Sequence, residues 1–310
     1  MPQFFEQARQ HFISFPLVIS ALLSGQHAAS ALPLLQGLIT DDRLTELSGM
    51  AAVSYNKDQF WAINDGGHGS FLYAISSKGN IERELKLPNI ENVDVEDIAA
   101  FRYKKRQLLA IADVGDNGGV RHVRPIYIIA EPKAGSDEIK LQWTVRFRFP
   151  DKLHDCESLF VDAVEGYIYL VNKRTEVPIL FRVPLKPRGD EIVTAERIGE
   201  LPGVKSVQYD AAIGVSENQL KYATQPTSVA LSCDRRTIAL LTYTAIYYFR
   251  RSKGQRWADA IADATPEQVV LPPLPQAESI AYSTDCQHLY VSSERTPSPI
   301  WRFEAPKAKK

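Results

Sequence analysis

The sequence predicts an all-β fold, a five-bladed β-propeller, on three observations. A five-residue segment recurs five times, starting at residues 47, 95, 156, 226 and 277. Each copy is followed by two more short runs rich in Ile, Val, Tyr and Phe and bounded by turn residues, which is the pattern of β-strands. Helical periodicity is nearly absent. Three to four strands in each repeat of about 50 residues are typical of propeller blades.

The recurrent segments align without gaps, and we expect each to form the innermost strand of a blade. They cover residues 47–51, 95–99, 156–160, 226–230 and 277–281. The second strands are predicted at residues 60–64, 108–112, 167–171, 238–242 and 289–293. The third strands are predicted at residues 71–75, 126–130, 179–183, 246–250 and 300–304. Because the repeats follow one pattern throughout, residues 32–310 are interpreted as a single propeller domain.

The fifth repeat has only three predicted strands, and the apolar stretch 34–39 has no partner near it in the sequence. Pairing this stretch with the last strand would close the ring and leave no exposed sheet edge. A six-bladed ring, with a degenerate blade hidden in the 70-residue interval between residues 156 and 226, is the alternative. We favour five blades because residues 201–226 are rich in Gly, Lys, Ser, Gln and Asn, which is typical of a loop.

The first 31 residues are interpreted as a secretory signal peptide. An apolar run at 12–23 is followed by the small-residue triplet Ala29-Ser30-Ala31, which suits a cleavage site. Twelve residues are too few for a helix that needs roughly 20 to cross a bilayer. The charged segment before the run is weak, because Arg9 is offset by Glu6, and an ordinary N-terminal helix is the alternative. The expected location is periplasmic or secreted.

The charge balance and the cysteines narrow the function classes. Lys and Arg number 36 against 37 Asp and Glu, so no global field attracts nucleic acid or anionic lipid. The three cysteines are an odd number and form no disulfide framework. Cys233 and Cys286 occupy similar turn positions, and one bridge between neighbouring repeats is an alternative. We favour the interpretation that Cys156, Cys233 and Cys286 are three separate small residues.

Polar residues are expected to meet on one face of the ring. The second residue of each recurrent segment would surround the axis: Ser48, Glu96, Glu157, Thr227 and Glu278. The ends of the second strands reach the same face. They contribute Asn64, Asp65, Asp113, Asp116, Asn117, Lys173, Arg174, Tyr243 and Glu294. Three of the five ring positions therefore carry a carboxylate.

Carboxylates that converge on an axis repel one another unless a cation neutralises them. Ca²⁺, or Mg²⁺, suits a mixture of carboxylates, hydroxyls and carbonyls, so we predict metal ligands at Glu96, Glu157, Glu278 and Asp113. One alternative has no metal, with Lys173 and Arg174 as counterions. Another is a transition-metal site that uses His68, His122 and His154. In a third alternative, the three glutamates only hydrogen-bond backbone amides of neighbouring blades.

Six motifs together resemble one protein family. They are Leu-Ser-Gly-Met-Ala at 47–51, Trp61-Ala-Ile-Asn-Asp65-Gly, Asp94-Val-Glu-Asp-Ile-Ala99, Asp113-Val-Gly-Asp-Asn117 with Arg121, Asp155-Cys-Glu157 and Gln276-Ala-Glu278-Ser-Ile-Ala. The chain resembles bacterial extracytoplasmic propellers of the SdiA-regulated and phytase-like type. The resemblance implies a calcium-associated propeller and, for the phytase-like branch, phosphoester or ester hydrolysis. The chain departs from the pattern at His68, Cys233 and Cys286, which lie in turns.

Two functions follow as hypotheses. The first is a binding module whose face holds a small anionic ligand or a cell-envelope partner. Its predicted ligand face is Asn64, Asp65, Asn117, Arg174 and Glu294. The second is a Ca²⁺-dependent phosphoesterase or esterase, phytase-like or lactonase-like. Its predicted catalytic residues are Glu157, Asp116, Arg121 and Lys173.

The binding module is favoured because no nucleophile has a dedicated base, and neither a Gly-x-Ser-x-Gly motif nor a phosphate-binding loop is present. A purely structural propeller is a third alternative.

Overall fold

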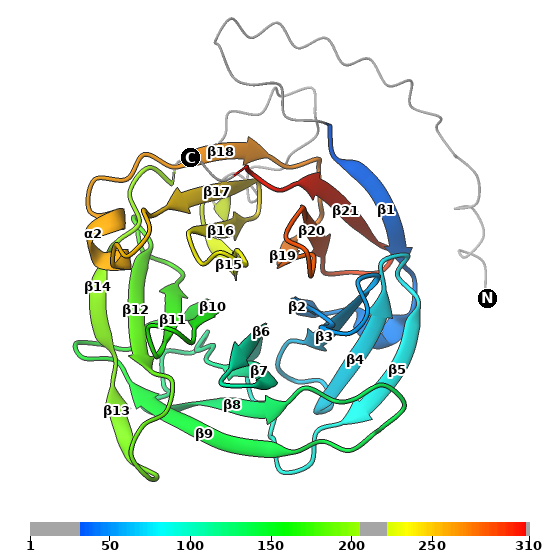
Figure 1. Cartoon of the computed structure of the whole chain (residues 1–310), viewed down its shortest axis with the longest axis horizontal. Helices are drawn as coiled ribbons and strands as arrows, with labels where there is room; N and C mark the ends of the chain where they lie inside the picture. Colours follow the sequence, from blue (N-terminus) through cyan, green and yellow to red (C-terminus); the bar gives the residue numbers. More distant parts are fainter. Residues whose placement is uncertain (1–31, 205–221, 308–310) are drawn as a thin grey trace, which may run out of the picture. The chain divides into compact units, whose positions relative to one another are not determined.

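The computed structural model describes residues 32–204 and 222–307. The predicted signal peptide and most of the predicted loop 201–226 lie outside these ranges. The described residues form five sheets of mainly antiparallel strands that follow one another around a ring. The strand that begins each of the five sequence repeats is the innermost strand of its sheet (Figure 1). The chain is therefore a five-bladed β-propeller, and the six-bladed alternative is wrong.

The strands match the predicted series blade by blade. The first blade comprises β2 (Leu47–Ala52), β3 (Gln59–Asn64), β4 (Phe71–Ser76) and β5 (Ile81–Lys86). The second comprises β6 (Val95–Tyr103), β7 (Arg106–Asp113), β8 (Arg124–Ala130) and β9 (Leu141–Arg148), with β13 (Ile192–Thr194) parallel to β9. The third comprises β10 (Cys156–Asp162), β11 (Tyr167–Asn172), β12 (Ile179–Pro184) and β14 (Glu196–Glu200).

The last two blades complete the ring. The fourth comprises β15 (Pro226–Leu231), β16 (Thr237–Thr242), β17 (Ala245–Arg250) and β18 (Glu267–Val270). The fifth comprises β19 (Ala277–Tyr282), β20 (His288–Ser293), β21 (Ser298–Glu304) and β1 (Leu34–Ile39). Two short helices, η1 (Asp42–Leu44) and α2 (Trp257–Ile261), complete the described elements.

The core lies between adjacent blades, and the middle strands show why their sequences are apolar throughout. In β11, Ile168 and Leu170 pack in the cluster shared with the second blade. The alternate residues Tyr169 and Val171 pack in the cluster shared with the fourth blade. Successive strand residues point to opposite faces of a sheet, and here both faces are covered. A middle strand therefore needs an unbroken apolar run rather than a polar face.

Each innermost strand carries a β-bulge at the same place. The pairing with the second strand shifts between Leu47 and Gly49, and equivalent shifts occur in the other four blades. The residues skipped by these shifts are Ser48, Glu96, Glu157, Thr227 and Glu278. A bulge bends its strand and redirects a side chain. The five predicted ring residues are thus the five bulge residues.

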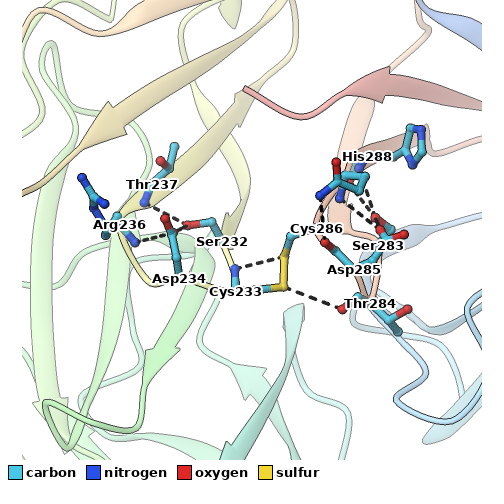
Figure 2. Close-up of a disulfide and its surroundings, with 11 residues drawn as sticks. Ser232, Cys233, Asp234, Arg236, Thr237, Ser283, Thr284, Asp285, Cys286 and His288 are labelled. Atoms are coloured by element: carbon cyan, nitrogen blue, oxygen red, sulfur yellow. Dashed lines mark hydrogen bonds between the residues drawn. A yellow bond between two sulfur atoms is a disulfide. The ribbon is translucent and has the colours of Figure 1, made fainter. Parts of the chain in front are cut away.

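Cys233 and Cys286 form a disulfide with a Cα–Cα distance of 6.0 Å, so the interpretation as three separate cysteines is wrong for this pair. The bond joins the β15–β16 turn to the β19–β20 turn, which lie in neighbouring blades (Figure 2). Pairing needs two turns to approach closely, and residue spacing alone does not reveal that. Cys156 is a free, buried thiol in the core.

The N-terminal strand β1 pairs antiparallel with β21 as the fourth strand of the fifth sheet. It also contacts the first blade, because the Leu38 amide donates a hydrogen bond to the Lys78 carbonyl at 3.1 Å. A Cβ added at Gly37 would lie 2.5 Å from the Lys78 backbone. The fifth and first blades thus meet through a close backbone approach that only glycine permits.

Replacing this glycine tests how much the contact contributes. We expect Gly37→Ala to destabilise the fold by about 1–3 kcal/mol, because a backbone neighbour cannot rotate away from the added methyl group. Urea unfolding followed by tryptophan fluorescence measures the change. Gly199→Ala is the matched control in another outermost strand, since its Cβ would meet only the end of the Ile261 side chain, at 3.3 Å. Equal stabilities for the two variants would contradict the inference.

Candidate functional site

The bulges bring carboxylates from neighbouring blades together, and two groups of three share one residue. Asp65, Asp94 and Glu96 form the first group, with a carboxylate oxygen of each within 4.8 Å of the others. Glu96, Asp155 and Glu157 form the second group under the same limit. Glu96 therefore lies where the acidic residues of the first three blades meet.

Local backbone structure explains how these side chains are positioned in the acidic groups. Asp65 follows the end of β3, whereas Asp94 and Asp155 directly precede the innermost strands β6 and β10. The Asp65 amide donates to the Glu46 carbonyl at 2.9 Å, which fixes the end of β3 against the start of β2. Asn92 donates to the carbonyls of Asn64 and Asp65 at 3.2 and 3.0 Å. The segment before β6 is thereby tied to the end of β3.

Glu96 is the acidic residue of the site whose negative charge is least compensated by neighbouring donors and cations. It is 4% exposed, and its Oε1 atom has no hydrogen-bond partner among the described residues. Burial, followed by the charges of Glu157 and Asp65, raises the pKa of Glu96 well above its ordinary value. A carboxyl in this setting needs either a proton or a cation.

The pKa values of the other two acids of the first group, Asp65 and Asp94, are also raised. Burial is the main cause that raises the pKa of Asp65 to about 7, and the charges of Asp94 and Glu157 add to it. Burial also raises the pKa of Asp94, against the influence of Arg121. Within the described chain none of Asp65, Asp94 and Glu96 forms an ion pair. Among the described residues, no cation in contact with this group therefore balances its negative charge.

Glycine 115 leaves space beside this group. A Cβ at Gly115 would lie 2.6 Å from a carboxylate oxygen of Asp94 and would overlap Oε1 of Glu96. The backbone thus runs directly along the carboxylates, in the loop that follows β7.

Basic residues contact the second group but not the first. Lys173 Nζ lies 3.1 Å from Oε2 of Glu157, and Arg174 Nε lies 2.7 Å from Oδ2 of Asp155. Burial acts to lower the pKa of Lys173, yet Glu157 and Glu278 outweigh it and raise that pKa well above its usual value. The alternative without a metal expects Lys173 and Arg174 to be the counterions of the carboxylates. They contact Glu157 and Asp155, which are only part of the acidic cluster.

Two of the predicted metal ligands lie outside both groups. Asp113 accepts a hydrogen bond from the Asp94 amide at 3.1 Å and forms an ion pair with Arg121 at 2.6 Å, so it positions Asp94. Glu278 accepts from Gln276 Nε2 at 3.0 Å. Burial raises the pKa of Glu278 to about 8 and that of Glu294 to about 9.

The loop after β7 uses its polar residues mainly for its own structure. Asp116 is buried, accepts hydrogen bonds from the amides of Val120 and Arg121 and forms a buried ion pair with Arg124. Burial acts to raise the pKa of Asp116, but these donors outweigh it and lower that pKa. Asn117 accepts a hydrogen bond from Arg174, whose side chain is 54% exposed. Asp116 is therefore poorly placed to act as a free base.

The remaining predicted residues are placed as follows. Asn64 is buried, and its Nδ2 donates to the Arg43 carbonyl at 2.6 Å. His68 and His122 are exposed, and His154 is buried 3.0 Å from Asp151. In the described ranges the groups able to hold a metal contain carboxylates alone.

Asp94 and Asp155 are site residues that reasoning from the ring positions missed. Both precede a bulge glutamate by two residues, in Asp94-Val-Glu96 and Asp155-Cys-Glu157. Residues two apart in an extended chain share one face, so this repeated spacing carried the signal.

Comparison with known proteins does not assign this chain to a family. No protein-family model matches the sequence, and no curated protein matches it. Among solved structures, a chain in "Crystal structure of Nidogen/Laminin Complex" is similar with 10% sequence identity and a TM-score of 0.41. The match covers 80% of this chain and 72% of that chain. Likeness at this level supports no functional inference. No helix in the described ranges has the length and apolar character needed to cross a membrane.

The buried charge of Glu96 predicts how stability depends on pH when metal is removed. A pKa raised by folding means that the folded chain retains this proton to higher pH than the unfolded chain does. Stability should therefore fall as pH rises past the ordinary glutamate range.

In EDTA, we expect Glu96→Gln to be more stable than the wild type at pH 8 and to lose less stability between pH 5 and pH 8. Chemical denaturation at both values measures this. Glu138→Gln, at an exposed position, should follow the wild type. A Glu96→Gln protein that is less stable than the wild type at pH 8 would contradict the assignment of uncompensated charge.

Proposed function

We propose that this protein is a Ca²⁺-binding propeller whose acidic face holds a small anionic ligand against the metal. The observation that carries the proposal is Glu96, whose buried and unpartnered Oε1 belongs to a carboxylate shared by two three-carboxylate groups. A cation bound between these groups would satisfy that oxygen and offset the burial and the mutual repulsion that raise the pKa values of Glu96 and Asp65.

The donor set favours Ca²⁺ over other metals. Asp65, Asp94, Glu96, Asp155 and Glu157 offer only hard oxygen ligands. Ca²⁺ accepts six to eight oxygens in irregular geometry, whereas Mg²⁺ requires a compact octahedron and retains water. Zinc prefers nitrogen and sulfur ligands. The carboxylates come from three blades with different local geometry, which suits the more permissive ion.

The surrounding cations favour an anion as the additional ligand. Arg174 is half exposed, and it contacts Asp155 of the second group and Asn117 of the adjacent loop. An anion that coordinates Ca²⁺ beside Asp155 could also accept hydrogen bonds from this guanidinium group. The proposal includes a periplasmic or secreted location, because the Cys233–Cys286 disulfide fits an oxidising compartment.

Metal binding is tested with the chain itself. We expect Ca²⁺ to raise the melting temperature of the wild type, with a stabilisation of about 2.7 kcal/mol at 100 times the dissociation constant. Gly115→Ala should weaken calcium affinity at least tenfold in calorimetric titration, because its methyl group would displace Asp94 and Glu96.

Gly118→Ala is the matched control in the same loop, because a Cβ there would come no closer than 3.7 Å to another heavy atom. Equal calcium affinity in the two variants, or no calcium binding by the wild type, would overturn the metal assignment.

Anion binding is tested with inorganic phosphate as the probe. We expect phosphate to bind the calcium-loaded protein and not the EDTA-treated protein, as followed by calorimetry. Arg174→Gln should weaken this binding by roughly tenfold, since a charge-assisted hydrogen bond contributes about 1.5–3 kcal/mol. The control Arg197→Gln removes an exposed arginine from an outer strand. Phosphate affinity that depends neither on calcium nor on Arg174 would contradict the proposal.

A hydrolase is the second candidate, and one observation favours it. Burial raises the pKa of Glu278 to about 8 and that of Glu294 to about 9, so these carboxyls retain a proton to higher pH than an ordinary glutamate does. A neutral carboxyl can donate a proton to a leaving group. Turnover of a phosphoester and lactone panel with Ca²⁺, lost in Glu294→Gln and in Glu157→Gln, would support this candidate. The absence of turnover on the whole panel would leave the binding function.

A further inference from the structure

A cavity lies on the ring axis, away from the acidic groups. It has a volume of about 670 Å³ and is lined by residues of all five innermost strands. Its walls include one buried apolar residue from each of these strands: Met50, Ile98, Phe160, Val229 and Ile280. Cavities of 300–1,000 Å³ with apolar walls are typical of small-molecule sites.

The order of residues in β6 places this cavity relative to the acidic site. Glu96 belongs to the acidic groups, Asp97 is fully buried next to it, and Ile98 lines the cavity. Residues in a strand advance by about 3.3 Å, so one layer at the level of Asp97 separates the two sites. The other lining residues continue into the turns that follow the innermost strands, and the cavity opens there.

Charge at the cavity is of one sign. Among the residues that the structure describes, those lining the cavity include Arg102, Lys104 and Arg235 but no Asp or Glu. Arg235 is already paired with Asp162 at 3.1 Å. Arg102 and Lys104 are exposed, and the Lys104 ammonium group lies over the Tyr103 ring rather than against a carboxylate. The apolar interior thus has a basic rim.

The disulfide holds one side of this rim. Cys233 and Cys286 both line the cavity, and their bond joins the turns of the fourth and fifth blades (Figure 2). The Cys233 Sγ atom also lies 3.8 Å from the Thr284 carbonyl, and Thr284 is another lining residue. The crosslink therefore limits how far these two turns can separate.

We propose that this cavity binds a medium-chain fatty carboxylate, with the acyl chain along the ring axis and the carboxylate at Arg102 and Lys104. An apolar wall selects a hydrocarbon chain, and the basic rim without acidic residues selects an anionic head group over a neutral or cationic one. The site is independent of the acidic groups, so binding requires no calcium.

The test is calorimetric titration of the full chain in EDTA with octanoate, decanoate and dodecanoate below their micelle concentrations. We expect affinity to rise about fourfold for each added methylene, which corresponds to about 0.8 kcal/mol. Decanol should bind more weakly than decanoate, and decyltrimethylammonium should not bind. Absence of binding by all three carboxylates, affinity independent of chain length, or equal affinity for the cationic amphiphile would overturn the proposal.

Variants locate the ligand. Ala100 is exposed and lines the cavity, so Ala100→Trp should block the site without loss of folding, which circular dichroism checks. Lys104→Ala should weaken decanoate at least fivefold and leave decanol unchanged, whereas Lys152→Ala, at another exposed lysine, should change neither. Decanoate binding unaffected by both Ala100→Trp and Lys104→Ala would show that the ligand lies elsewhere.

Two further measurements distinguish this cavity from the acidic face and from a membrane-binding surface. Decanoate should bind Glu96→Gln as it binds the wild type, so failure of the calcium site and failure of this proposal are distinguishable. Loss of decanoate binding in Glu96→Gln would assign the ligand to the acidic face. Vesicles of phosphatidylglycerol should not bind the chain, and vesicle binding without binding of dissolved decanoate would overturn the proposal in favour of a membrane surface.

Discussion

The structure depends on how five innermost strands fit around one axis. The residue after each bulge is Gly49, Asp97, Ser158, Ser228 or Ser279, so Asp97 is the one large side chain in this layer. Its carboxylate accepts hydrogen bonds from the Leu159 amide of the third blade at 3.0 Å and from Ser228 Oγ of the fourth at 3.1 Å. A Cβ at Gly49 of the first blade would lie 3.0 Å from Oδ1 of Asp97. Asp97 thus connects its own blade to the third and fourth blades by hydrogen bonds and packs closely against Gly49 of the first.

This layer divides the axis into two chemical environments. Before this layer in the strands, bulge glutamates and the aspartates two positions earlier gather negative charge, which Lys173 and Arg174 balance only in part. After the layer of Asp97, apolar residues of the innermost strands line a cavity whose rim is basic. A single strand, β6, serves all three levels in consecutive residues: Glu96, Asp97 and Ile98. The two sites that we propose, one for a hard cation and one for an amphipathic anion, would therefore both be built on a single repeated segment.

Most of the strand order and the ring positions could be predicted from sequence, because period-two and apolar runs recur with the blade. The bulges could not, since nothing in Leu-Ser-Gly-Met-Ala or its copies distinguishes a skipped residue from a paired one. The two groups of three carboxylates share Glu96 and come from the first three blades, and the ring positions alone do not indicate this grouping. The Cys233–Cys286 bond depended on the approach of two turns, a tertiary property. The geometry of the candidate site thus depends on tertiary departures from the repeat.

We propose that a calcium ion binds between the carboxylates that share Glu96. The most direct measurement is a crystal structure of the chain grown with Tb³⁺ in place of Ca²⁺, with anomalous scattering used to locate the ion. We expect one strong peak within coordination distance of Glu96 and of carboxylates from Asp65, Asp94, Asp155 or Glu157. No peak at Glu96, or a peak confined to Glu278 and Glu294, would contradict it.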